Sequence, residues 1–216
     1  MLKKAFLLLS ASTLVGCVNT ATVKLDTSHS SALVGKSLVV ATSDNPDFLA
    51  MTPGKAMFAV VGTLAMYSAG NDLVKEHSVE DPAVYIGSQL ANVMANAQGI
   101  KPVAGVFSSN NNAVKDQLQA HSGYDYVLDV RTGYWALTYF PTDWERYRVL
   151  YNVKARLIDV ANEKVIAEAF CARVPKEQGD SPKTYDQLIN RNAAGLKAEL
   201  RAAGDFCLQD LSNKLF

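Results

Sequence analysis

Two groups of residues come close to the type and spacing of a reactive site. Residues 30–37 read S-x-x-x-x-G-K-S, which is one residue away from a phosphate-binding loop. Such a loop holds phosphate with the amides at the start of a helix, whereas here the first glycine is missing and a strand is expected next. His29, His77 and His121 are isolated, with no second histidine or cysteine two to four residues away, as a typical zinc site would have. The sequence therefore predicts no nucleotide chemistry, no metal site and no cofactor.

Acidic residues in strand segments are the other candidates for catalysis. Asp125, Asp129 and Glu168 lie in or beside such segments, and no G-x-S-x-G nucleophile motif occurs. Carboxylates at sheet positions are more typical of a solvated face, or of an ion pair with Arg131 or Arg173, than of paired acid and base catalysis. We therefore expect that the protein is not an enzyme.

Composition and charge limit the remaining classes. The chain has 216 residues, of which 49% are hydrophobic and 19% are charged, and 21 basic side chains balance 21 acidic ones. These values are ordinary for one globular domain. Without a basic excess there are no charges to neutralise phosphates, so we expect no nucleic-acid partner.

The first residues have the pattern of a signal peptide. Lys3 and Lys4 precede an apolar run over residues 5–15, which is too short to cross a bilayer core of about 30 Å. Leu14-Val15-Gly16-Cys17 follows and resembles the lipobox of bacterial lipoproteins. The resemblance implies cleavage before Cys17 and acylation of Cys17 with fatty acids such as palmitate. Val18, in place of an aspartate, implies sorting to the outer membrane, facing the periplasm.

Cys171 and Cys207 remain once Cys17 carries lipid. Cys171 falls in a strand-like run and Cys207 in the last helical segment. The periplasm is oxidising, and two cysteines have one intramolecular pairing, so we predict a disulfide that joins helix to sheet. The alternative is a pair of buried free thiols.

Hydrophobic periodicity and turn residues predict the elements. Asp81 and Pro82 form a helix start, and Gly99 ends that helix. Asn152, Lys154 and Arg156 alternate with apolar residues, as in a half-buried strand. The expected elements are strand 38–42, helix 82–98, strand 103–107, a weak helix 111–121, strands 126–140, 149–157 and 165–174, and a long amphipathic helix 184–215 bent at Gly195 or Gly204.

This order predicts an α/β (α+β) layered sandwich: a mixed five-stranded sheet with helices, ending in a long C-terminal helix. We expect a signal peptide at residues 1–16, a lipidated flexible tether at 17–35 and one globular domain at 36–216. The lipobox, strand 38–42, the helix after Asp81 and the hairpin 149–174 together resemble the N-terminal-TolB-like fold of envelope lipoproteins. These include the curli-secretion lipoprotein and the activators of penicillin-binding proteins.

Aromatic residues concentrate around a turn at residues 141–143. Seven of the nineteen aromatics, including both tryptophans, fall within residues 134–151. Some must be core, and two alternatives stay open: the cluster is core only, or it also forms an interface, where aromatics and arginine are typical. The candidates for partner binding are Tyr134, Trp135, Trp144 and Tyr147.

An apolar insertion occupies residues 53–70. Residues 56–67 carry no charge and show no one-sided stripe, so they must be covered by the sheet, by the membrane interface or by another copy. The continuous apolar character differs from the alternating hairpins of the curli channel, which argues against a pore. The candidates for membrane contact or self-association are Met57, Phe58, Val61, Leu64 and Met66.

The sequence thus predicts a lipid-anchored, non-enzymatic binding or assembly component of the cell envelope, in which homo-oligomers are one option. The alternative is an envelope hydrolase or lipid-handling protein with a pocket between sheet and helices.

Overall fold

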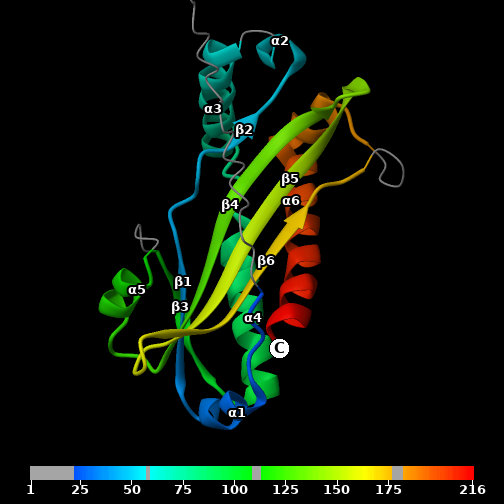
Figure 1. Cartoon of the computed structure of the whole chain (residues 1–216). Helices are drawn as coiled ribbons and strands as arrows, with labels where there is room; N and C mark the ends of the chain where they lie inside the picture. Colours follow the sequence, from blue (N-terminus) through cyan, green and yellow to red (C-terminus); the bar gives the residue numbers. More distant parts are fainter. Residues whose placement is uncertain (1–21, 57–58, 109–112, 177–181) are drawn as a thin grey trace, which may run out of the picture.

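The computed structural model describes residues 22–216 except 57–58, 109–112 and 177–181, so Cys17 and the predicted signal peptide lie outside the described residues. Figure 1 shows the chain as a long twisted sheet with two helices along one face. The elements in chain order are α1 (Thr27–Ser30), a 3-10 turn (Ser31–Leu33), β1 (Ser37–Thr42), β2 (Leu49–Ala50), α2 (Pro53–Ala56), α3 (Ala59–Glu76), α4 (Pro82–Gln98), β3 (Lys101–Ser108), α5 (Val114–Ala120), β4 (Tyr126–Phe140), β5 (Asp143–Asp159), β6 (Lys164–Arg173) and α6 (Tyr185–Leu215).

The sheet is mixed, as predicted. Five strands follow the order β3-β1-β4-β5-β6, and β2 pairs separately with β4. The pairs that involve β1 or β2 are parallel, whereas β4–β5 and β5–β6 are antiparallel. The α+β class and the parallel-then-antiparallel order are therefore confirmed. Two features differ from the expectation: the two-residue strand β2 is additional, and β5 begins at Asp143 rather than at residue 149.

Helices α4 and α6 cover one face of the sheet and bury the main core. Helix α4 begins where the Asp81 carboxylate accepts a hydrogen bond from the Ala83 amide, with Pro82 in the first turn. It ends at Gly99, whose φ of 67° is a left-handed conformation that glycine adopts without strain. Both helix boundaries are confirmed.

The opposite face of the sheet is covered at its two ends by α5 and α3. Near the start of β4, Val127 packs in a cluster with Val39 and residues of α5. Towards the end of β4, Ala136 packs with Leu49 and Met66 of α3. Figure 1 shows α5 and α3 at opposite ends of the sheet. The stretch between them carries the charged residues that are described below.

Helix α6 is interrupted near its start. Thr184 and Gln187 form a capping box, but Asn190 is extended and the next three residues have φ values of 54° to 58°. The bend expected at Gly195 or Gly204 thus lies at residues 190–193. Gly195 follows the break where the chain approaches itself: a Cβ there would lie 2.4 Å from the Gln187 carbonyl oxygen. The sequence therefore indicates a small residue beside the break, but it does not indicate where the break lies.

Residues 23–35, expected in the flexible tether, are packed on the domain. Leu25 and Leu33 are buried. Val23 pairs with Glu168 of β6, and the Leu25 amide donates to the Leu215 carbonyl oxygen. The domain therefore begins before residue 36, because two leucines in this polar segment have apolar surface to bury.

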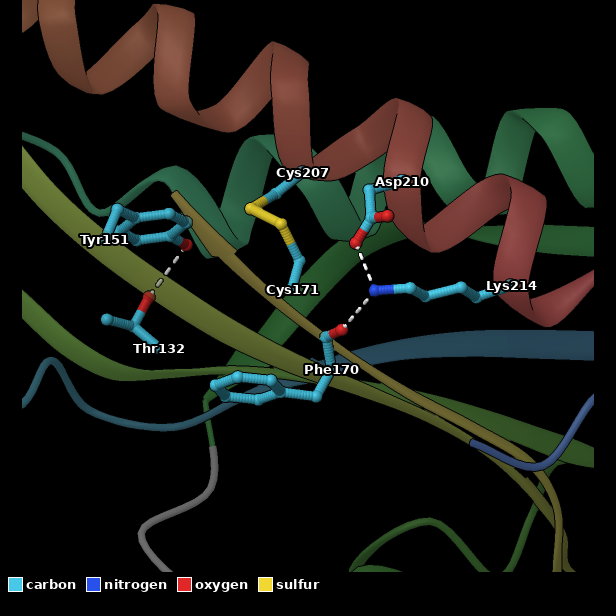
Figure 2. Close-up of a disulfide and its surroundings, with 7 residues drawn as sticks. All are labelled: Thr132, Tyr151, Phe170, Cys171, Cys207, Asp210 and Lys214. Atoms are coloured by element: carbon cyan, nitrogen blue, oxygen red, sulfur yellow. Dashed lines mark hydrogen bonds and ion pairs between the residues drawn. A yellow bond between two sulfur atoms is a disulfide. The ribbon is translucent and has the colours of Figure 1, made fainter. Parts of the chain in front are cut away.

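The predicted disulfide is present between Cys171 of β6 and Cys207 of α6, with a Cα–Cα distance of 5.5 Å. Figure 2 shows a second link beside it: the Lys214 ammonium donates to the Phe170 carbonyl oxygen at 2.9 Å and to Asp210 at 2.6 Å. The last helix is thus fixed to the strand by one covalent bond and one charged side chain.

Candidate functional site

A groove of about 360 Å³ lies at the far end of the β4–β5 hairpin. The residue after β2 forms one side and the hairpin forms the floor and the other side. Its main lining residues are Met51, Tyr134, Tyr139, Pro141, Trp144 and Arg148. We call this hollow the aromatic groove.

Trp144 is the most exposed large side chain of the groove, with 60% of its surface accessible. Its ring contacts Tyr139 edge-on, with centroids 6.2 Å apart, and its indole nitrogen donates to the Pro141 carbonyl oxygen at 3.2 Å. The indole is therefore held in place by the turn but is not covered by it. An exposed, positioned tryptophan is typical of an interface residue.

Polar side chains at the base of the groove affect which ligands it would favour. The Thr138 hydroxyl is buried and has no hydrogen-bond partner among the described residues. Arg148 is paired with Thr138 across the strands, its guanidinium lies 4.8 Å from the centre of the Phe140 ring, and it donates to the Pro175 carbonyl oxygen at 3.0 Å. Because the Thr138 oxygen is buried, Thr138 forms part of the floor, and Arg148 is the charged group that a ligand in the groove would meet.

Tyr134 completes the groove on the α3 side. Burial raises the pKa of its hydroxyl, with a smaller effect from Tyr67. Tyr134 therefore stays neutral at physiological pH and offers an apolar ring with a hydrogen-bonding tip.

Two of the four predicted partner-binding residues are core residues instead. Trp135 is 1% exposed, meets Phe48 edge-on and donates from its indole to the Pro46 carbonyl oxygen at 2.7 Å. Tyr147 is 8% exposed and packs against Tyr139 and Tyr185. The prediction failed for Tyr147 because β5 starts earlier than expected, which places Tyr147 on the apolar face of the strand rather than in a loop.

Residues 62–70 of the insertion are buried on one side of α3 and exposed on the other. Met66 is buried against Leu49 and Ala136, so its assignment to membrane contact or self-association is wrong. Leu64 is 69% exposed and stays a candidate. Met57 and Phe58 lie outside the described residues, and the Val61 side chain is not described.

Helix α3 is held against the segment before β2. The Asn71 side chain accepts from the Phe48 amide at 2.9 Å and donates to Asp47 at 2.8 Å. A Cβ on Gly70 would lie 1.8 Å from the Phe48 carbonyl oxygen, so only glycine permits this approach. No helix in the described part of the chain is long and apolar enough to cross a membrane.

The acidic candidates all have structural partners. Asp125 accepts from the Ser37 amide at 2.8 Å and from the Ser37 hydroxyl at 2.7 Å, and these bonds, with Lys36, lower its pKa to about 2. Lys36 and Ser37 of the phosphate-loop-like stretch therefore serve to hold a loop, and a strand follows them as expected. Asp129 forms an ion pair with Arg131, which is one of the two arginines predicted for this role. Glu168 forms an ion pair with Lys154. Within the described ranges, no cluster of three or more potential metal ligands occurs.

A buried polar network lies between the sheet and α4, next to a hollow of about 560 Å³ that is lined by Asp81 and by residues of α4 and α6 such as Tyr85 and Arg201. Thr132 donates to the Asp81 carboxylate, and the Tyr151 hydroxyl lies 2.9 Å from the Thr132 hydroxyl (Figure 2). Burial raises the pKa of Asp81, and burial together with Asp81 raises that of Tyr151. The Asp81 carboxylate also caps α4, because it accepts a hydrogen bond from the Ala83 amide.

Sequence reasoning missed Met51, Thr138, Tyr139 and Arg148 as groove residues. Alternation along β5 would have placed Arg148 on the same face as Asn152, but only the register of β4 against β5 brings Thr138 opposite Arg148. Met51 reaches the groove through the unexpected strand β2.

No family model matches the chain, and no curated protein matches it. Several solved structures are similar to it. The PelC dodecamer from Paraburkholderia phytofirmans is 16% identical, with coverage of 91% of this chain and 96% of that one and a TM-score of 0.38. The C-terminal domain of LpoB from Salmonella enterica is 12% identical, with coverage of 66% and 84% and a TM-score of 0.31. Lipoprotein GNA1162 from Neisseria meningitidis is 19% identical, with coverage of 81% and 99% and a TM-score of 0.29.

Proposed function

We propose that the protein is a lipid-anchored outer-membrane lipoprotein that faces the periplasm and binds another envelope protein without catalysing a reaction. The observation that supports binding is the exposed, positioned indole of Trp144 at the edge of the aromatic groove. The lipobox at residues 14–17 supports the anchor.

The groove indicates the chemistry of the partner. A volume of about 360 Å³ accommodates a few side chains rather than a folded domain. Rings from Tyr134 and Trp144 would cover an apolar side chain, while Arg148 would hydrogen-bond to a backbone or carboxylate oxygen beside it. We therefore propose that a peptide segment of the partner enters the groove with an apolar residue next to an acceptor.

Replacement of Trp144 tests this proposal. Trp144→Ala removes a mostly exposed side chain with one ring contact and one hydrogen bond, so the melting temperature should fall by no more than about 4 °C. Recovery of the partner from envelope extracts, quantified against the unchanged protein, should fall at least about tenfold, as expected for an interface hot spot.

Phe206→Ala is the matched control, because Phe206 is an exposed aromatic of α6 outside the groove. Its recovery of the partner should be unchanged. Equal recovery by both variants would contradict the groove as the binding surface. Light scattering on the same proteins identifies the case in which the partner is a second copy, since Trp144→Ala would then lower the molecular mass of the assembly.

A further inference from the structure

The hollow beside Asp81 lies where α4 begins and α6 packs against it (Figure 1). Its volume of about 560 Å³ matches a small organic molecule or a short peptide. Two of its lining residues, Val79 and Leu200, are buried apolar side chains, 5% and 2% exposed. The hollow therefore offers an apolar surface between the two helices, on which a ligand side chain could pack.

The charged residues around this surface come from two different elements. Glu80 and Asp81 belong to the segment that leads into α4, whereas Lys197 and Arg201 lie one turn apart on α6. In the part of the chain that the structure describes, no ion pair joins these two acids to these two cations. The hollow thus has acidic groups on one element and basic groups on the other, and they do not neutralise each other by contact.

Arg201 is matched by other groups, so Lys197 is the cation that remains. Arg201 donates from Nε to Asp205 Oδ1 at 3.2 Å, and its guanidinium carbon lies 3.6 Å from the centre of the Tyr85 ring. Lys197 is half-buried and has no hydrogen bond or ion pair with any described residue. A half-buried ammonium group is a favourable partner for a carboxylate, to which it donates charge-assisted hydrogen bonds.

Asp81 is a buried carboxylate whose hydrogen bonds come from neutral donors. It is 6% exposed, and its Oδ1 accepts from the Ala83 amide at 2.8 Å and from the Thr132 hydroxyl. Burial raises the pKa of this carboxyl. An ammonium group in the hollow would stabilise its charged form, and the exposed Glu80 beside it adds a second negative charge.

We propose that this hollow binds a short peptide by its two charged ends, with the terminal ammonium near Glu80 and Asp81 and the terminal carboxylate on Lys197. A simple anion is disfavoured by the two acids, and a simple cation by the two basic residues of α6. A ligand that carries both charges complements both elements. The site shares no lining residue with the aromatic groove and does not depend on the protein partner proposed there.

Calorimetric titration of the purified full chain in a non-ionic detergent tests the proposal. The probes are the dipeptides alanylleucine and leucylalanine, each with free ends, with an acetylated amino end and with an amidated carboxyl end. We expect saturable binding of at least one free dipeptide, and binding at least about tenfold weaker when either end is blocked. Absence of saturation by both free dipeptides, or equal affinity for free and blocked forms, would overturn the proposal.

Single charge changes connect each end of the ligand to its residue. Lys197→Gln should weaken binding of the free dipeptide by about tenfold or more but should leave binding of the amidated form unchanged, because that form has no carboxylate. Glu80→Gln should weaken the free dipeptide and spare the acetylated form. Glu80 is chosen over Asp81 because Asp81 caps α4.

Lys101→Gln is the matched control, because Lys101 is an exposed lysine of β3 outside the hollow. Its affinity for the free dipeptide should equal that of the unchanged protein. All three variants should keep the melting temperature within about 4 °C, since each replaces a side chain at a position that is not buried. Equal affinities for Lys197→Gln and Lys101→Gln would show that the carboxylate does not bind at Lys197.

Discussion

Breaking the disulfide between Cys171 and Cys207 should lower the free energy of unfolding by about 4 kcal/mol. The two residues are 36 apart in sequence, and the bond limits the conformations of the unfolded chain within that loop. The chain-entropy relation for a loop of this length gives about 13 cal/mol/K, or about 4 kcal/mol at 25 °C. For a domain of this size such a loss corresponds to a fall in melting temperature of roughly 8–16 °C.

Urea denaturation of the oxidised and the reduced protein measures this difference. Both cysteines are fully buried, so the protein must be reduced while unfolded and then refolded in reductant. Reduced protein keeps both sulfur atoms and is therefore a better reference than Cys171→Ala, which also leaves a cavity. The slope of the unfolding free energy with urea should rise slightly on reduction, because the unfolded chain then exposes more surface.

Two results would refute this reasoning. Titration of the oxidised protein under denaturant should detect no thiol from Cys171 or Cys207, and two reactive thiols would show that the bond is absent. Identical urea midpoints for oxidised and reduced protein would show that restriction of the unfolded chain by this bond does not stabilise the folded state.

Four further predictions address the anchor, the core, the helix break and the response to acid. Cys17→Ser should leave the precursor uncleaved and without fatty acid, whereas mass spectrometry of the unchanged protein should find an acylated Cys17 as its first residue. Trp135→Ala should cost roughly 3–5 kcal/mol in urea denaturation, which a surface position would not. Gly195→Ala forces a Cβ against the Gln187 carbonyl oxygen and should cost about 1–3 kcal/mol. Asp125 has a folded-state pKa of about 2, below its unfolded value of about 3.9, so its stabilisation is present above pH 4 and is lost as pH falls towards 2; Asp125→Asn should flatten that part of the stability–pH curve.

Much of the scaffold could be predicted because its signals are local. Asp81, Pro82 and Gly99 mark the ends of α4 by their own backbone preferences, and the β5–β6 hairpin follows from alternation on both sides of a turn. The disulfide followed from a count of two cysteines in one compartment. None of these inferences requires knowledge of which strands pair in the sheet.

The incorrect predictions concern features that depend on contacts between distant parts of the chain. The break in α6 places Arg191, Asn192 and Ala193 in a left-handed conformation that their own preferences disfavour, so tertiary packing decides it. Strand β2 lies between α3 and β4, with which it pairs. Because β4 is distant from β2 in sequence, no local pattern predicts this pairing. The fate of Tyr147 depended on where β5 begins, and a strand boundary is a weak signal in a stretch of alternating aromatics and arginines.

Strand β5 shows why the groove residues were not predicted, even though the alternation of apolar and polar residues along this strand was interpreted correctly. Its odd-numbered residues from 147 to 157 face α4 and α6 and are buried. Its even-numbered residues run from Arg148 in the aromatic groove to Lys154 and Arg156, which form ion pairs with Glu168 and Asp129. Period-2 alternation identifies this second face but describes it only as polar. The register with β4, which the alternation does not contain, sets Thr138 opposite Arg148 and Asp129 opposite Arg156, and α5 and α3 cover the two ends of this face.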